Sequence, residues 1–224
     1  ADIVAGVVSG STTATLTKSG YSLTITKTGG STNPVHGLYP NGSPLNTLPA
    51  DPVNNIEGLH IGRTWGANGT GWIDAHGQLR SEDYEFDFSQ DLDKFTFLIG
   101  ALNDNTDGIE KLRIVDIQNG GVSVLSSCTF SIRVDYDVWE SDSIVFNQTT
   151  RDIEGQGFPK ANGWNESSMV TIECSVSFDK IIFQRSDYEN DRADVNAGGE
   201  NYTNGLTITG FAAYLAQPEI DVQG

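Results

Sequence analysis

The chain alternates apolar and polar residues in short runs, a pattern typical of strands that bury one face. Such runs occupy residues 13–17, 21–27, 84–89, 93–100, 110–117, 121–134, 143–147, 169–184 and 206–215. They are rich in β-branched and aromatic residues, which suit a pleated sheet. No segment shows a convincing apolar repeat of 3.6 residues, so the pattern predicts an all-β protein.

The spacing of the runs indicates how the strands connect. Residues 13–17 and 21–27, framed by Gly20 and by Gly29 and Gly30, predict a β-hairpin. Residues 84–89 and 93–100 predict two strands across a tight, Asp-rich turn. Many short strands joined by polar turns favour an antiparallel β-sandwich, here jelly-roll-like and with long loops, which the residues described below predict to be calcium-binding.

Three segments are expected along the chain. Residues 1–57 form an N-terminal hairpin and an irregular connection packed on the main domain, residues 58–216 form the main β-sandwich, and residues 217–224 form a linker to a following domain. The Pro-rich stretch within residues 31–55 is either a functional loop or plain linker. We expect the chain to be a monomeric module excised from a longer protein.

The net charge of the chain disfavours some classes of binding partner. Thirty acidic residues stand against 13 basic ones, a formal net charge of −17, and nearly all the surplus lies beyond residue 60. Such a surface disfavours nucleic acid and anionic membrane. No apolar run approaches the ~20 residues that span a bilayer, so no membrane insertion is expected. The acidity either serves solubility or marks loops that hold metal ions.

The first candidate metal loop follows residues 93–100. Asn103, Asn105 and Asp107 are spaced at i, i+2 and i+4 and precede a glycine, like the first half of an EF-hand loop. The second half fails, because position twelve is Ile114 rather than Glu. We therefore predict a calcium site of another kind, with Asp104 and a distant carboxylate completing it. An Asx-rich turn without metal is the alternative.

The second candidate loop lies between the last two long apolar runs. It carries four carboxylates within eight residues, Asp187, Glu189, Asp191 and Asp194. Clustered carboxylates repel one another unless a cation neutralises them, and Ca²⁺ takes six to eight such oxygen ligands in irregular geometry. The sequence therefore predicts Ca²⁺ here. A third acidic cluster, at residues 135–142, is a weaker candidate.

Ligand-binding residues are expected in the remaining loops. Trp65 and Trp72 lie in a Gly-rich segment, Trp164 lies in a second irregular loop, and Asn201 belongs to the acidic loop. The aromatic residues form either walls of a ligand site or caps on strands. No G-x-S-x-G motif occurs and no histidine has an identifiable catalytic partner, so we expect no enzyme. Cys128 and Cys174 are either two buried thiols or a disulfide.

The motifs E-F-D-F-S, D-K-F-T-F, N-D-N-T-D-G and V-S-F-D-K-I-I-F, before a closing I-T-G-F, occur in that order from Tyr84. In this order they resemble calcium-binding β-sandwich domains of bacterial surface proteins. More narrowly, they resemble the peptide-binding module of repeats-in-toxin (RTX) adhesins, over about residues 58–215. The resemblance implies a secreted, cell-surface module active in cell adhesion and biofilm formation. It further implies recognition of a short peptide or protein C-terminus, through a calcium ion that meets a ligand carboxylate. A calcium-dependent, lectin-like module that binds glycans and a structural spacer are the alternatives.

Overall fold

The protein is described by a computed structural model that covers residues 7–8, 11–29, 36–40, 59–63, 81–100, 104–105, 108–134, 143–156, 168–189 and 206–216. The strands are β1 (Thr13–Lys18), β2 (Tyr21–Lys27), β3 (His36–Pro40), β4 (Leu59–Arg63), β5 (Ser81–Gly100), β6 (Asp104–Asn105), β7 (Gly108–Asn119), β8 (Val122–Ser123), β9 (Cys128–Val134), β10 (Ser143–Asn147), β11 (Asp152–Gln156), β12 (Ser168–Glu189) and β13 (Leu206–Leu215). The only helical element of these residues is a 3-10 turn, η1 (Leu125–Ser127). Every strand pairing is antiparallel, which confirms the predicted all-β class.

The N-terminal hairpin forms as the sequence predicts. β1 pairs with β2 from Thr13↔Thr26 to Lys18↔Tyr21, across a two-residue turn. Both turn residues have a positive φ, 53° at Ser19 and 83° at Gly20, as a tight turn that follows the right-handed twist of the strands requires. β2 then pairs with β5, so the hairpin belongs to the same sheet as the later strands.

Two long strands organise the sheet. β5 has 20 residues and β12 has 22, and they pair along nearly their full length, from Ser168↔Ile99 to Ser186↔Ser81. The expected turn between residues 84–89 and 93–100 is therefore wrong, because both parts of β5 pair with β12 rather than with each other. The register shifts in the middle, between Glu173 and Lys180. Such irregularities bend a strand without ending it.

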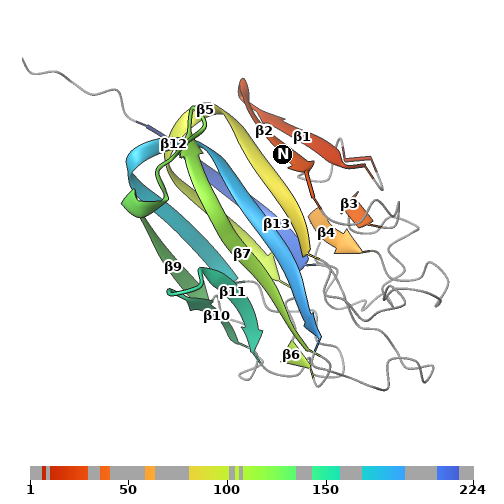
Figure 1. The fold of residues 1–224 in the computed structure, drawn as a ribbon. Coiled ribbons are helices and arrows are strands. Elements are labelled where there is room, and N and C mark those ends of the chain that lie inside the picture. The colour runs from red at the N-terminus through yellow and green to blue at the C-terminus, as the bar shows by residue number, and fades with distance from the viewer. Residues whose placement is uncertain are drawn as a thin grey trace, which may run out of the picture.

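The bends fold the sheet over on itself, so that two halves face each other (Figure 1). The front half consists of β1, β2, residues 81–88 of β5, residues 180–189 of β12, β6, β7, β8, β11 and β10. The back half consists of β3, β4, β13, residues 92–100 of β5, residues 168–174 of β12 and β9. Both halves remain parts of one 13-stranded sheet.

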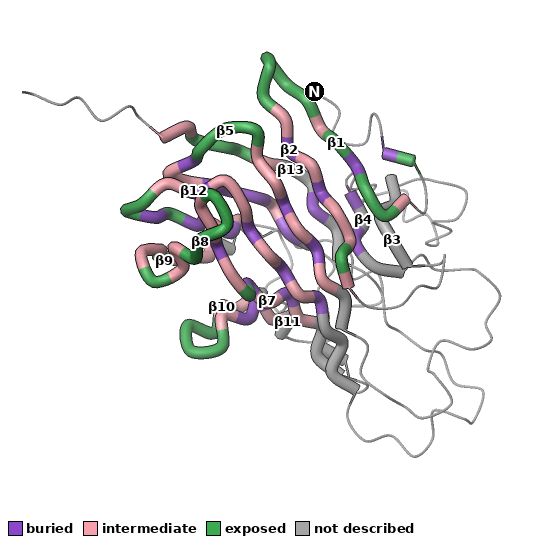
Figure 2. The backbone as a smooth tube through the Cα atoms, turned by 45° about the horizontal axis from the view of Figure 1, so that its top comes forward, coloured by how far each residue is buried: buried purple, intermediate pink, exposed green. Residues whose placement is uncertain are grey.

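Aromatic side chains fill the space between the halves. The ring of Phe86, in the front half, lies 6.5 Å from that of Phe95 and 6.2 Å from that of Phe211, both in the back half. Likewise Phe97 of the back half lies 5.7 Å from Phe183 of the front half. Apart from Phe211, these rings are almost wholly buried. Buried positions alternate with less buried ones along the strands, as the apolar pattern of the sequence predicts (Figure 2).

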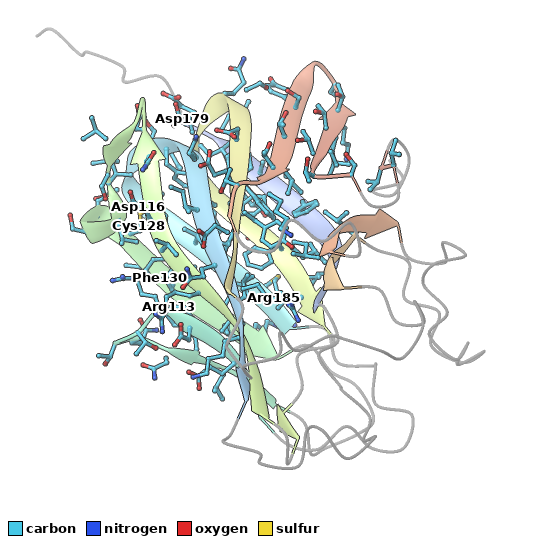
Figure 3. The ribbon with its side chains drawn as sticks, turned by 45° about the vertical axis from the view of Figure 1, so that its right-hand side comes forward. Arg113, Asp116, Cys128, Phe130, Asp179 and Arg185 are labelled. Carbon is cyan, nitrogen blue, oxygen red and sulfur yellow. A yellow bond between two sulfur atoms is a disulfide. The ribbon has the colours of Figure 1, made fainter. Side chains whose placement is uncertain are left out.

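A disulfide fastens one side of the back half. Cys128 at the start of β9 is directly opposite Cys174 of β12, and their sulfur atoms are bonded (Figure 3). Between the two alternatives that the sequence left open, the structure therefore shows a disulfide. Further along β9, the ring of Phe130 lies 5.3 Å from that of Phe146 in β10, which belongs to the front half. The side-chain amide of Gln148 donates a hydrogen bond of 3.3 Å to the Phe130 carbonyl.

Candidate functional site

One end of the folded sheet gathers the ends of many strands. β5 and β12 bend at the opposite end, so both ends of each strand lie at this one, as the pairs Ser81↔Ser186 and Ile99↔Ser168 show. The strand ends found here are Arg63, Ser81, Gly100, Gly108, Val134, Ser143, Gln156, Ser168, Glu189 and Leu206. We call this the loop end, because five segments between strands start and finish at these residues.

Every residue predicted to bind metal or ligand belongs to the loop end or to a segment that starts and finishes there. Eight of them lie outside the described residues: Trp65, Trp72, Asn103, Asp107, Trp164, Asp191, Asp194 and Asn201. The other four have a described backbone, Asp104 and Asn105 in β6 and Asp187 and Glu189 in β12. The topology thus brings the predicted segments to one end of the sheet.

The first residues of β7 lie between the two predicted metal loops. On one side, Asn105 of β6 pairs with Gly108, and on the other side Glu189 of β12 pairs with the same Gly108. Asp104 lies one position further along β6, opposite Ile109. Acidic segments that are more than 80 residues apart in the sequence therefore approach each other across a single strand.

Backbone register adds a carboxylate that the sequence analysis did not select. Glu110 of β7 is directly opposite Asp187 of β12, and residues directly opposite share a face of the sheet. Glu110 also continues the alternation of Leu112 and Ile114, which are buried in the core. The sequence signal for Glu110 was therefore its position two residues before Leu112, in the same alternation as the apolar residues of this strand.

The same alternation applies to β12 and β5. On β12 the buried residues Phe183 and Arg185 alternate with less buried ones, and Asp187 and Glu189 are at the next positions of the same alternation. On β5, Glu82 is two positions before the buried Tyr84 and is directly opposite Arg185. At the loop end, the positions in phase with the buried apolar residues of these strands therefore change from apolar to charged residues.

Among the side chains that the structure describes, Arg185 is the last buried one of β12 before the loop end (Figure 3). Its exposed fraction is only 3%, although it carries a guanidinium group with five donors. A buried charge is stable only when it is paired and hydrogen-bonded, and Arg185 does have polar or electrostatic partners. In the backbone register Arg185 is directly opposite Glu82, and the next pair toward the loop end with residues of the same alternation is Asp187↔Glu110.

An ion-pair cluster joins β7 to β11 beside the loop end. Arg113 donates to both carboxylate oxygens of Asp152, from Nε to Oδ1 at 2.6 Å and from Nη2 to Oδ2 at 2.9 Å. The Asp152 side chain is 2% exposed and that of Arg113 42%. Lys111 Nζ lies 2.9 Å from Glu154 Oε1 and 4.0 Å from Asp152 Oδ2. The cluster anchors β11 to the strand that carries Glu110.

The surroundings of Asp152 decide its pKa. Burial alone would raise this pKa, but hydrogen bonds from Arg113 and Thr150 and the charges of Arg113 and Lys111 outweigh burial and lower it. A lowered pKa stabilises the fold above the unfolded-state pKa of roughly 3.9. That contribution is lost as the pH falls through the folded-state pKa.

We expect Arg113→Met to lower the free energy of unfolding by about 2 kcal/mol at pH 7, because it removes two donors from a buried carboxylate. Urea denaturation measures this change. The double variant Arg113→Met/Asp152→Leu should recover at least half of the loss, since it removes the buried charge as well. In addition, Asp152→Asn should flatten the loss of stability below about pH 4. An unchanged free energy of unfolding in Arg113→Met would contradict the prediction.

Among the residues that the structure describes, no group of three or more His, Cys, Asp or Glu side chains is placed to hold a metal ion. No helix in the same residues is long and apolar enough to cross a membrane. Comparisons with protein-family models, curated protein sequences and solved structures found no significant match. The resemblance to an RTX adhesin module therefore stays a hypothesis.

Proposed function

We propose that the protein is a calcium-dependent ligand-binding module of a bacterial surface adhesin, built as a jelly-roll-like β-sandwich from the two facing halves. The observation that supports it most is the convergence of acidic segments at the loop end. Asp104 and Asn105 flank the start of β7 on one side and Asp187 and Glu189 on the other. We place Ca²⁺ between these segments, with Glu110 as a further ligand.

Electrostatics favours a cation at this position. Glu110 and Asp187 occupy directly opposite positions on one face, where like charges destabilise a sheet. Arg185 is set one row further toward the core. A divalent ion would neutralise the outer rows and accept their oxygen atoms.

The ligand would be a short peptide or protein C-terminus. A calcium ion with an open coordination position accepts a carboxylate from an incoming ligand, and aromatic side chains nearby add burial. Trp65, Trp72 and Trp164, together with Asn201, are our candidates for these walls, because their segments start and finish at the loop end. The disulfide is in keeping with the proposed secreted, cell-surface location, since disulfides persist in oxidising compartments.

The calcium site is tested by thermal unfolding with and without EGTA, and by native mass spectrometry to count bound ions. We expect stabilisation by about 3 kcal/mol when calcium exceeds its dissociation constant a hundredfold, because the ion binds only the folded state. Asp187→Asn and Glu110→Gln should each weaken calcium binding in calorimetry. Glu173→Gln, the matched control, changes the same charge near the bends and should leave binding unchanged.

Folded protein that stays metal-free at millimolar calcium would contradict the proposed site. The ligand is tested separately, with calcium present, by binding of free C-terminal peptides and of the same peptides amidated at the C-terminus. We expect the free carboxylate to be required. Binding to a glycan array without any response to peptides would instead support the lectin-like alternative.

A further inference from the structure

In the part of the chain that the structure describes, β1 is an edge strand with no strand paired on its outer side. Among the described residues it pairs only with β2, and its residues Thr13, Thr15 and Thr17 are exposed. An edge strand presents unpaired N–H and C=O groups, which form a template for another strand. Natural edges are commonly protected by proline, bulges or charged residues. The interior of β1 has none of these, since its sequence from Thr13 is T-A-T-L-T.

The hydrogen bonds of the hairpin show which backbone groups face outward. The Lys27 N–H donates to the Thr12 carbonyl at 2.7 Å, and bonded pairs alternate in an antiparallel ladder. Ala14 and Leu16 therefore exchange hydrogen bonds with β2, whereas the N–H and C=O groups of Thr15 and Thr17 point to the free edge. The outward groups of Thr13 are partly satisfied, because the Ser11 hydroxyl bonds to both.

The hairpin is also the region where a second copy can approach. The net charge of −17 makes two copies repel each other, but residues 1–60 hold only three acids against two bases. Two copies that meet along β1 therefore bring their least acidic parts together.

The sequence of β1 fits itself in antiparallel pairing. Pairing about Leu16 puts Thr15 opposite Thr17 of the second copy, so that their outward N–H and C=O groups bond reciprocally. The two Leu16 side chains meet on the other face, where Leu16 is only partly buried within one copy. We propose that β1 is a self-association edge, through which two copies of this chain, expected from the sequence to be a monomer, join their sheets into one. The proposal does not depend on calcium.

The association is tested by sedimentation velocity of the full chain between about 10 μM and about 1 mM, a range that covers weak affinities. We expect a monomer at the low end and a rising fraction of dimer at the high end. The fraction should increase with salt, because salt screens the repulsion between the two acidic chains. A monomer at every concentration and salt level would overturn the proposal.

Thr15→Pro is the deciding variant. It removes an edge-facing donor and no β1–β2 hydrogen bond, so it should weaken dimerisation at least tenfold. Thr15→Val, which keeps the donor and the β-branched shape, is the matched control and should still dimerise. A dimer that persists in Thr15→Pro would exclude this edge.

A second pair of variants keeps the test decisive if Thr15→Pro does not fold. Thr15→Lys keeps the backbone donor but adds a charge at the seam between the copies, so it should weaken the dimer several-fold. Thr24→Lys adds the same charge on the same face, directly opposite Thr15 but one strand away from the edge. It should not weaken the dimer, and equal loss in both variants would overturn the proposal.

Discussion

Replacing Cys128 and Cys174 together with serine should lower the free energy of unfolding by about 4 kcal/mol. The disulfide joins residues 46 positions apart. Closing a loop of this length lowers the conformational entropy of the unfolded chain, which corresponds to about 4 kcal/mol of stability at 25 °C. The loss should be seen first at β9, because β9 is an edge strand that pairs only with β12 among the described residues. Urea denaturation gives the global change, and hydrogen exchange of the β9 amides gives the local one.

The reducing agent dithiothreitol supplies the control for this prediction. The unmodified protein should lose a similar stability when dithiothreitol is added, and the double serine variant should not respond to it. If reduction leaves the urea midpoint of the unmodified protein in place, the disulfide does not stabilise the fold as we expect.

Truncating Phe86 to alanine should cost about 4 kcal/mol, the upper range for a large buried side chain. Its ring is fully buried and contacts Phe183 of the same half, at 4.9 Å, and Phe95 and Phe211 of the other half. The variant therefore leaves a cavity at the contact between the halves. Chemical denaturation measures the loss, with near-ultraviolet circular dichroism to confirm native packing.

Phe146→Ala is the matched control for this truncation. Phe146 is only partly buried and its ring contact is with Phe130 at the side of the sheet, so the same change should cost about 2 kcal/mol or less. Equal losses in the two variants would show that the fully buried aromatic layer contributes no more to stability than the partly buried ring contact at the side of the sheet.

The strands of this fold could be predicted from the sequence because their residues alternate locally. The hairpin of β1 and β2 is the clearest case, since its strands and its turn lie within 15 residues. The course of β5 could not be predicted in the same way. Its buried residues change phase between Phe86 and Phe95, which looks like a turn when the strand is considered alone. Only pairing with β12, distant in the sequence, keeps the strand continuous through this change.

The candidate site likewise contains residues that could be predicted from the sequence and one that could not. Residue type and close spacing within one loop singled out Asp104, Asp187 and Glu189, because clustered oxygen ligands suit calcium. It did not single out Glu110, which becomes relevant only when β7 is placed next to β12. The pairing of these strands depends on contacts more than 60 residues apart, and no local pattern encodes it.

The bends of β5 and β12 have a consequence for how the protein unfolds. Each of these strands supplies pairing partners to both halves, so neither half contains a complete set of neighbours without the other. Peeling one half away would break two continuous strands at their centres and expose the shared aromatic layer. The protein should therefore lose its structure in a single cooperative step, and a partly unfolded form with one intact half should not accumulate.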